Sequence, residues 1–103
     1  MGFNYQEMMK QARAMQRQME KIQEELKNTE FEASSGGGAV KVKVNGDQEI
    51  LSLSINKDAV DTDDITMLED MVMVAVNDAL KKSKDEARSR LSGLTGGMGI
   101  PGF

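Results

Sequence analysis

The sequence contains neither cysteine nor histidine, and only 4% of its 103 residues are aromatic. Without cysteine the chain can form no disulfide framework and no metal site built on thiolates. Without histidine as well, it lacks the residue types that most often serve as general base, activated nucleophile or metal ligand. We therefore expect a protein that is not an enzyme, that holds no metal or cofactor, and that has no small-molecule substrate.

Long hydrophobic runs are missing too. No stretch approaches the roughly 20 apolar residues that span a bilayer, and the N-terminus lacks the basic region and apolar core of a secretory signal. Charged residues make up 29% and hydrophobic residues 39% of the chain, which is an ordinary balance for a soluble protein. We expect one domain over residues 1–94, in the cytoplasm and without a membrane partner, followed by a flexible glycine-rich tail at residues 95–103.

The predicted secondary structure consists of two long helices and a short sheet. Residues 5–28 are good helix formers without glycine or proline, and a second helix is predicted from residue 64 to between residues 91 and 94. Alternating apolar and polar residues predict strands at 29–35, 39–44 and 49–56. Asn45-Gly46 predicts a two-residue type I′ turn before the last strand, because both positions of such a turn require φ > 0. The fold class is therefore α+β, in the order α-β-β-β-α, with a three-stranded antiparallel meander that has one apolar face.

The first helix carries two stripes of side chains. At about 100° per residue, apolar side chains three and four positions apart share one side of the helix, and basic side chains fall on the other. The apolar stripe consists of Met8, Ala12, Met15, Met19, Ile22 and Leu26. The basic stripe consists of Lys10, Arg13, Arg17 and Lys21. A basic outer face is either simply solvated or in contact with an anionic partner, and no acidic residue interrupts this stripe.

The second helix is apolar around much of its circumference between residues 65 and 79. A helix of this kind is buried on more than one side, which one small sheet and one other helix cannot easily provide. We therefore predict a homodimer, and a monomer with one loosely covered side is the alternative. The predicted interface residues are Met67, Met71, Met73 and Val74.

The formal net charge of −4 hides a segregation of charge along the chain. Residues 61–80 carry six acidic side chains and no basic one, whereas residues 81–103 carry five basic and two acidic ones. Opposite the main apolar face of the second helix, a second basic stripe consists of Lys81, Lys84 and Arg88. Cations near a helix C-terminus are favoured by the helix dipole whatever the function, so this stripe has a structural explanation beside a functional one.

Two other patterns resemble binding motifs only in part. Gly36-Gly37-Gly38 follows a strand, but neither a Lys-Ser/Thr pair nor a helix start follows it, so a flexible turn is predicted rather than a phosphate-binding loop. The aspartates between residues 58 and 64 do not have the spacing of an EF-hand. We expect these aspartates to be solvated and to cap the second helix.

Four segments, in the right order and spacing, resemble the bacterial YbaB/EbfC nucleoid-associated proteins: MKQARAMQRQMEKIQEEL, GGGAVKVKVNG, DDITMLEDMVMVAVNDALKK and GGMGIPGF. The resemblance covers nearly the whole chain. It implies a tight homodimer whose projecting helices resemble tweezers, bind double-stranded DNA, organise the nucleoid and influence gene expression. The positions that match the family's DNA-contacting arms are Lys10, Arg13, Arg17 and Lys21 on the first helix, and Lys81, Lys84 and Arg88 on the second.

Two functional hypotheses follow. In the first, the dimer binds DNA through phosphate contacts, which position a protein on the duplex without reading bases. In the second, the acidic segment and the methionine-rich surfaces serve a protein partner or a structural dimer, without significant DNA binding. The negative net charge taken alone argues against DNA, because phosphates require cations, whereas the basic stripes argue for it.

Overall fold

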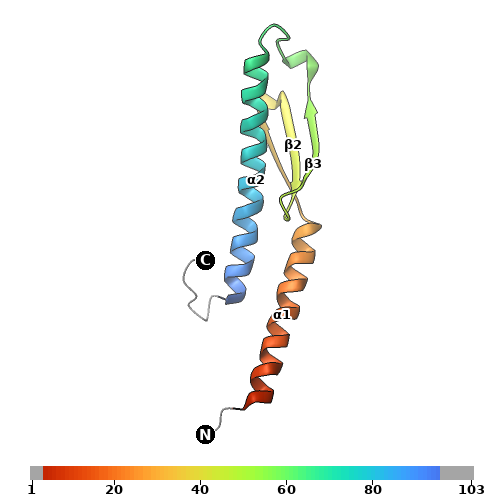
Figure 1. Cartoon of the computed structure of the whole chain (residues 1–103). Helices are drawn as coiled ribbons and strands as arrows, with labels where there is room; N and C mark the ends of the chain where they lie inside the picture. The colour runs from red at the N-terminus through yellow and green to blue at the C-terminus, as the bar shows by residue number, and fades with distance from the viewer. Residues whose placement is uncertain (1–3, 96–103) are drawn as a thin grey trace.

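The computed structural model describes residues 4–95, which form two long helices and a small sheet (Figure 1). The elements are α1 (Tyr5–Lys27), β1 (Glu30–Ser35), β2 (Val40–Asn45), β3 (Ile50–Ile55) and α2 (Ile65–Thr95), with 3-10 turns at Gly36–Gly38 and Lys57–Ala59. The predicted α+β class and the order of its elements are confirmed. Thr95 ends α2, and the rest of the tail predicted at residues 95–103 lies outside the described residues.

The core forms where α2 packs on the sheet. The strands are antiparallel in the order β1-β2-β3, so β2 is central, and its Val40, Val42 and Val44 are fully buried. On the helix, Ala75 and Ala79 are equally buried, and their small side chains let the helix axis come close to the strands. The core is completed by Ala33 and by the partly buried Phe31, Leu68, Met71, Val72, Val76 and Leu80.

The edge strand β3 is left largely uncovered. Leu53 and Ile55 pair with Val42 and Val40, so they share the apolar face of the sheet, as the alternation of the sequence predicted. They are nevertheless 49% and 42% exposed, because α2 packs on β1 and β2. A helix about 10 Å wide covers about two strands spaced 4.8 Å apart, and the third strand of this sheet has no second helix above it.

The helix α1 projects from the sheet as an arm (Figure 1). Its first turn is capped by Asn4, whose Oδ1 accepts hydrogen bonds from the backbone N–H groups of Gln6 and Glu7 at 3.1 and 3.3 Å; asparagine is among the preferred residues at this position. Only the last turn of the arm is buried, at Leu26. The molecule is consequently elongated, with principal extents of 74 × 24 × 16 Å.

The turn between β2 and β3 is not the predicted two-residue type I′ turn. Its positive φ, 64°, is at Gln48 and not at Asn45 or Gly46. The Asn45 side chain shapes a longer loop instead, because its Oδ1 accepts hydrogen bonds from the backbone N–H groups of Asp47 and Glu49, both at 3.0 Å. Asparagine favours such local side-chain bonds as readily as a positive φ, and here the local bonds determine the turn.

The turn predicted at Gly36–Gly38 is a 3-10 turn whose three glycines have φ values of 62°, 68° and 96°. Glycine adopts this region without steric cost. A side chain at Gly36 would also collide with the Sδ atom of Met71 on α2. The glycines therefore allow a tight connection between β1 and β2 directly beside the helix.

We expect Val42→Ala to lower the free energy of unfolding by about 2–3 kcal/mol, because it removes two buried methyl groups and leaves a cavity at the centre of the core. Chemical denaturation followed by circular dichroism measures the change. The exposed neighbour Lys43 supplies the control, since Lys43→Ala should alter the same free energy by less than about 0.5 kcal/mol. Equal losses in the two variants would show that the core is assigned incorrectly.

Candidate nucleic-acid interface

The basic side chains on one side of the arm form a surface that we call the α1 row: Lys10, Arg13, Arg17 and Lys21. All four are exposed, and none makes an ion pair or a side-chain hydrogen bond with another described residue. The row is about 16 Å long at a rise of 1.5 Å per residue, and Glu20 and Glu24 border it near Lys21. Exposed cations held in line by a helix attract a polyanion.

The apolar stripe of α1 lies opposite the α1 row. Leu26 is buried, and Met15 and Ile22 are half-buried. Met8 and Met19 are 41% and 38% exposed, and the free end of the arm extends past the described end of α2 (Figure 1). The predicted two-sided character of this helix is thus present in the structure, but its apolar side is only partly covered.

Acidic side chains gather at the other end of the molecule. The exposed ones are Asp61, Asp63, Asp64, Glu69, Asp70 and Asp78. They belong to the first half of α2 and the loop before it, which lie beside the sheet, whereas the free end of α1 points away from it (Figure 1). This acidic cluster is therefore separated along the long axis from the α1 row, and it repels a polyanion from its end of the molecule. The arm itself also carries Glu7, Glu20, Glu24 and Glu25.

In the second basic stripe, Lys81 is engaged with a partner on its own helix. Its Nζ donates a hydrogen bond to Asp85 Oδ2 at 2.7 Å, in a pair whose side chains are 74% and 54% exposed. This hydrogen bond lowers the pKa of the Asp85 carboxyl below its ordinary value; desolvation partly opposes the shift, and the charges of Lys81 and Arg88 reinforce it. The pair reduces the charge that Lys81 can offer to a second partner.

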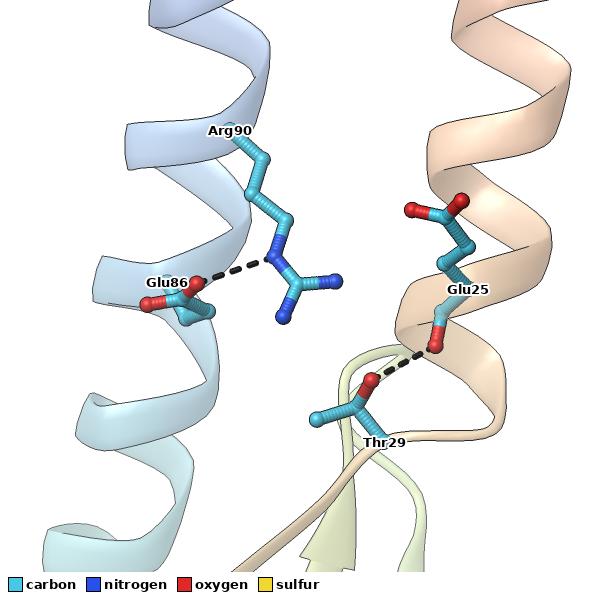
Figure 2. A network of polar contacts seen from close by, with 4 residues as sticks. All are labelled: Glu25, Thr29, Glu86 and Arg90. Carbon is cyan, nitrogen blue, oxygen red and sulfur yellow. Dashed lines mark hydrogen bonds and ion pairs between the residues drawn. The ribbon is translucent and has the colours of Figure 1, made fainter.

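Two further cations of α2 have hydrogen-bond partners within the chain. Lys82 Nζ donates to the backbone oxygen of Glu32 at 2.8 Å, which ties α2 to β1. Arg90 Nε donates to Glu86 Oε1 at 2.9 Å. Figure 2 shows the Arg90 side chain in the space between the two helices, with Glu25 on the facing side of α1. These two cations are therefore not available to a partner in the way the α1 row is.

The structure does not bring the two basic stripes together. Lys84 and Arg88 are exposed, on the side of α2 opposite the buried Ala75 and Ala79, which face the sheet. The α1 row likewise lies opposite Leu26, the residue that packs at the base of the arm. Within one chain, the α1 row and the second stripe therefore face outward in different directions and do not form a single surface.

Sequence reasoning left out the cations of the sheet. Lys41 and Lys43 are exposed on the face opposite α2, where the alternation along β2 places them. Lys43 lies opposite Glu32 in the register of β1 and β2, and a cross-strand neighbour of opposite sign offsets its charge. The charge that Lys43 adds to this face is therefore reduced, whereas Lys41 lies opposite the uncharged Ser34.

The four residues predicted at a dimer interface occupy two environments. Met67, Met73 and Val74 are 53%, 56% and 50% exposed. Met71 packs against the core of its own chain, and its backbone oxygen accepts a hydrogen bond from Ser35 Oγ at 2.6 Å. Further large apolar side chains are exposed on β3 and at the start of α2, at Ile50, Leu51, Leu53, Ile55 and Ile65.

The described residues provide little that resembles a site for chemistry. Among residues 4–95, no group of three acidic side chains is arranged to hold a metal ion. No helix in the same range combines the length and the hydrophobicity that crossing a membrane requires. A hollow of about 650 Å³ at the free end of the arm is lined entirely from one helix, by Tyr5, Gln6, Met9, Lys10 and Arg13. A hollow of this origin is simply the space between neighbouring side chains on the surface of the helix.

Comparisons with known proteins show what the chain is similar to. The model of the YbaB/EbfC DNA-binding family matches residues 1–98. A nucleoid-associated protein of Clostridium novyi is 52% identical over 102 residues, which cover 99% of this chain and 90% of that protein. One of Pelotomaculum thermopropionicum is 49% identical over 103 residues, which cover 100% and 98%. The crystal structure of an uncharacterized protein from Helicobacter pylori superposes with a TM-score of 0.76 at 26% identity, over 88% of this chain and 95% of that one. The chain therefore belongs to the YbaB/EbfC DNA-binding family.

Proposed function

We propose that this protein binds double-stranded DNA through contacts between the α1 row and backbone phosphates. The observation that carries the proposal is the row itself, which presents four exposed cations without side-chain partners among the described residues, on one side of a projecting helix. Lysine and arginine contacts to phosphate fix the position of a protein on the duplex and carry no sequence information directly. Membership of a DNA-binding family supports the same partner.

The number of phosphates that one chain can reach limits its affinity. Each phosphate neutralised on duplex DNA contributes about −0.9 to the slope of log K against log salt, so four cations contribute about −3.6 at most. The net charge of −4 opposes binding. The six acidic side chains of residues 61–80 are, however, at the far end of the molecule, and charges more than about 10 Å apart are largely screened at 0.1 M salt. One chain alone would therefore bind weakly.

We further propose a homodimer that joins through the apolar surface of β3 and α2. Leu53 and Ile55 of β3, and Ile65 and Met73 of α2, are between 42% and 56% exposed. Apolar patches of this kind mark association sites on soluble proteins. A two-fold dimer buries the same patch on both subunits. It would also duplicate the α1 row, so that two arms grip DNA as a tweezer-like assembly.

Binding without base readout fits a general role on the chromosome. The two relatives described above are named nucleoid-associated proteins, and we place this chain in the nucleoid, within the cytoplasm. Dimers that cover many sites would organise the nucleoid and affect gene expression by occupying DNA. No catalytic activity is part of this proposal.

Reversal of two charges tests the α1 row. Arg13→Glu combined with Arg17→Glu should weaken binding to a random duplex at low salt by about 10- to 100-fold, because two phosphate contacts become repulsions. Fluorescence anisotropy measures the affinity. Lys41→Glu combined with Lys43→Glu is the matched control, since it changes the net charge equally on the outer face of the sheet and should have a much smaller effect. If the arm and sheet variants lose affinity equally, net charge and not the α1 row governs binding.

Light scattering tests the dimer. At micromolar concentration the chain should have twice its monomer mass, and Leu53→Asp should reduce the mass to that of a monomer by placing a charge in the apolar surface. Ser52→Asp adds the same charge on the other face of β3 and should leave the dimer intact. A monomeric mass for the unsubstituted chain would refute the assembly.

Release of Lys81 from its partner tests the contribution of α2. Asp85→Asn should raise DNA affinity by about two- to fivefold, since it frees one cation for a phosphate. Asp70→Asn removes the same charge at the acidic end of the molecule and should have a smaller effect. Equal affinities for Asp85→Asn and the unsubstituted chain would show that the second basic stripe does not contact DNA.

The same ion pair has a pH signature. Because the folded pKa of Asp85 lies below its unfolded value, the pair stabilises the fold above the unfolded pKa, and this contribution is lost as the pH falls through the folded pKa. An NMR titration of the Asp85 carboxyl should therefore show a pKa below the ordinary value, and Lys81→Met should return it toward that value. The same pKa in both proteins would show that the hydrogen bond does not form in solution.

A further inference from the structure

The turn after β2 is in close contact with the end of α1. Gly46 donates its backbone N–H to the carbonyl oxygen of Leu26 at 2.7 Å. A Cβ at Gly46 would collide with that oxygen and would lie 2.6 Å from the Leu26 Cβ and 2.7 Å from the Leu26 carbonyl carbon. Gly46 does not have a positive φ, so glycine is required here for close approach and not for its backbone conformation.

This contact completes the C-terminal end of the arm. The last carbonyl groups of a helix have no partner within the helix. The Glu25 carbonyl accepts a hydrogen bond from the Thr29 hydroxyl at 2.6 Å. The Leu26 carbonyl accepts one from the Thr29 N–H at 3.1 Å and one from Gly46, and Leu26 is only 3% exposed. Gly46 is thus a partner from the sheet that holds the base of the arm in place.

The second helix holds the same turn from the other side. Ser83 donates its hydroxyl to the carbonyl oxygen of Asn45 at 2.8 Å, and the two residues are 0% and 4% exposed. A buried hydrogen bond of this kind is costly to leave unmade. A continuous path of contacts therefore runs from α2 through the turn to α1. We call the four residues on this path the joint: Leu26, Asn45, Gly46 and Ser83.

We propose that the joint is a positioning element for DNA binding, which sets the direction in which α1 leaves the sheet and so places the α1 row relative to α2. The proposal rests on the DNA-binding function given above. On the N-terminal side of Leu26 the arm has little cover, so its direction is determined at its base. Lys10 lies about 24 Å along the helix from Leu26, and a rotation of about 10° at the joint moves it by about 4 Å. That displacement exceeds the reach of a hydrogen bond to a phosphate oxygen.

A chain without cysteine allows two labels to report the direction of the arm. Gln16→Cys on α1 and Ser89→Cys on α2 are both at exposed positions and accept nitroxide spin labels. Dilution of the labelled chain in excess unlabelled chain confines the measured distance to one chain. Gly46→Ala in this background should shift or broaden the distance distribution, because its Cβ has to displace the backbone of Leu26.

The matched control is a second glycine-to-alanine change. A Cβ at Gly93 on α2 meets nothing within 4 Å, so Gly93→Ala should leave the distance distribution unchanged. Ser83→Ala is the second test variant, since it removes the hydroxyl donor without adding volume and should broaden the same distribution. Distributions like that of the unsubstituted chain in the folded joint variants would overturn the proposal.

Titration of unlabelled proteins with duplex DNA across salt concentrations provides the functional readout. None of the three substitutions changes a charge. If the joint only stabilises the fold, the variants that remain folded should therefore have the same salt slope as the unsubstituted chain. If the joint positions the arm, the salt slope of Gly46→Ala should be flatter than that of the unsubstituted chain by at least about 0.9, which corresponds to the loss of one phosphate contact. The slope of Gly93→Ala should be unchanged. A shifted distance with an unchanged slope would overturn the positioning role. If the unsubstituted chain does not bind DNA at all, the proposed function fails, and the distances still decide whether the joint directs the arm.

Discussion

The burial of three valines of β2 beneath α2 is the interaction on which the rest of the structure depends. Ala75, Ala79 and Ser83 follow one another at every fourth position of α2, and all three are fully buried, so the helix presents a line of small side chains to the sheet. Close approach at the two alanines lets the next turn bring the Ser83 hydroxyl to the carbonyl oxygen of Asn45. The packing that forms the core thus also fixes the turn against which α1 ends.

The same packing leaves two surfaces without cover. One helix covers β1 and β2 and leaves β3 exposed, which is the basis of the proposed dimer. The arm of α1 lies beyond the sheet, where its cations meet no acidic partner among the described residues. A second subunit would address both features, since it would cover β3 and add a second α1 row. The distance between the acidic cluster at the start of α2 and the α1 row explains how a chain with a net charge of −4 can still offer cations to DNA.

Periodicity in the sequence predicted the elements and most of the core. Alternation places Val42 inside and Lys43 outside, and the spacing along α1 separates the apolar stripe from the basic one. Periodicity does not report distances between elements. It could not show that a single helix leaves Leu53 half exposed. Nor could it show that Gly46 is required by the carbonyl group of Leu26, a residue twenty positions earlier, and not by the conformation of a hairpin turn.

The charged residues show the same limit. A helical stripe predicts which cations share a side, and the four cations of the α1 row are all exposed as a stripe implies. It does not predict which cations are already engaged. Lys81 binds Asp85 on its own helix, whereas Lys82 reaches the backbone of β1. Both belong to the cluster after residue 80, and only the three-dimensional arrangement separates the roles of its members.

The salt dependence of DNA binding by the unsubstituted chain tests the central claim most directly. Affinities for several duplexes of unrelated sequence should fall linearly on a plot of log K against log salt. The slopes should agree between sequences and be steeper than the value of about −3.6 that a single α1 row allows, because a dimer presents two rows. An affinity that does not change with salt, or no binding to any duplex at low salt, would contradict an electrostatic grip by paired helical arms.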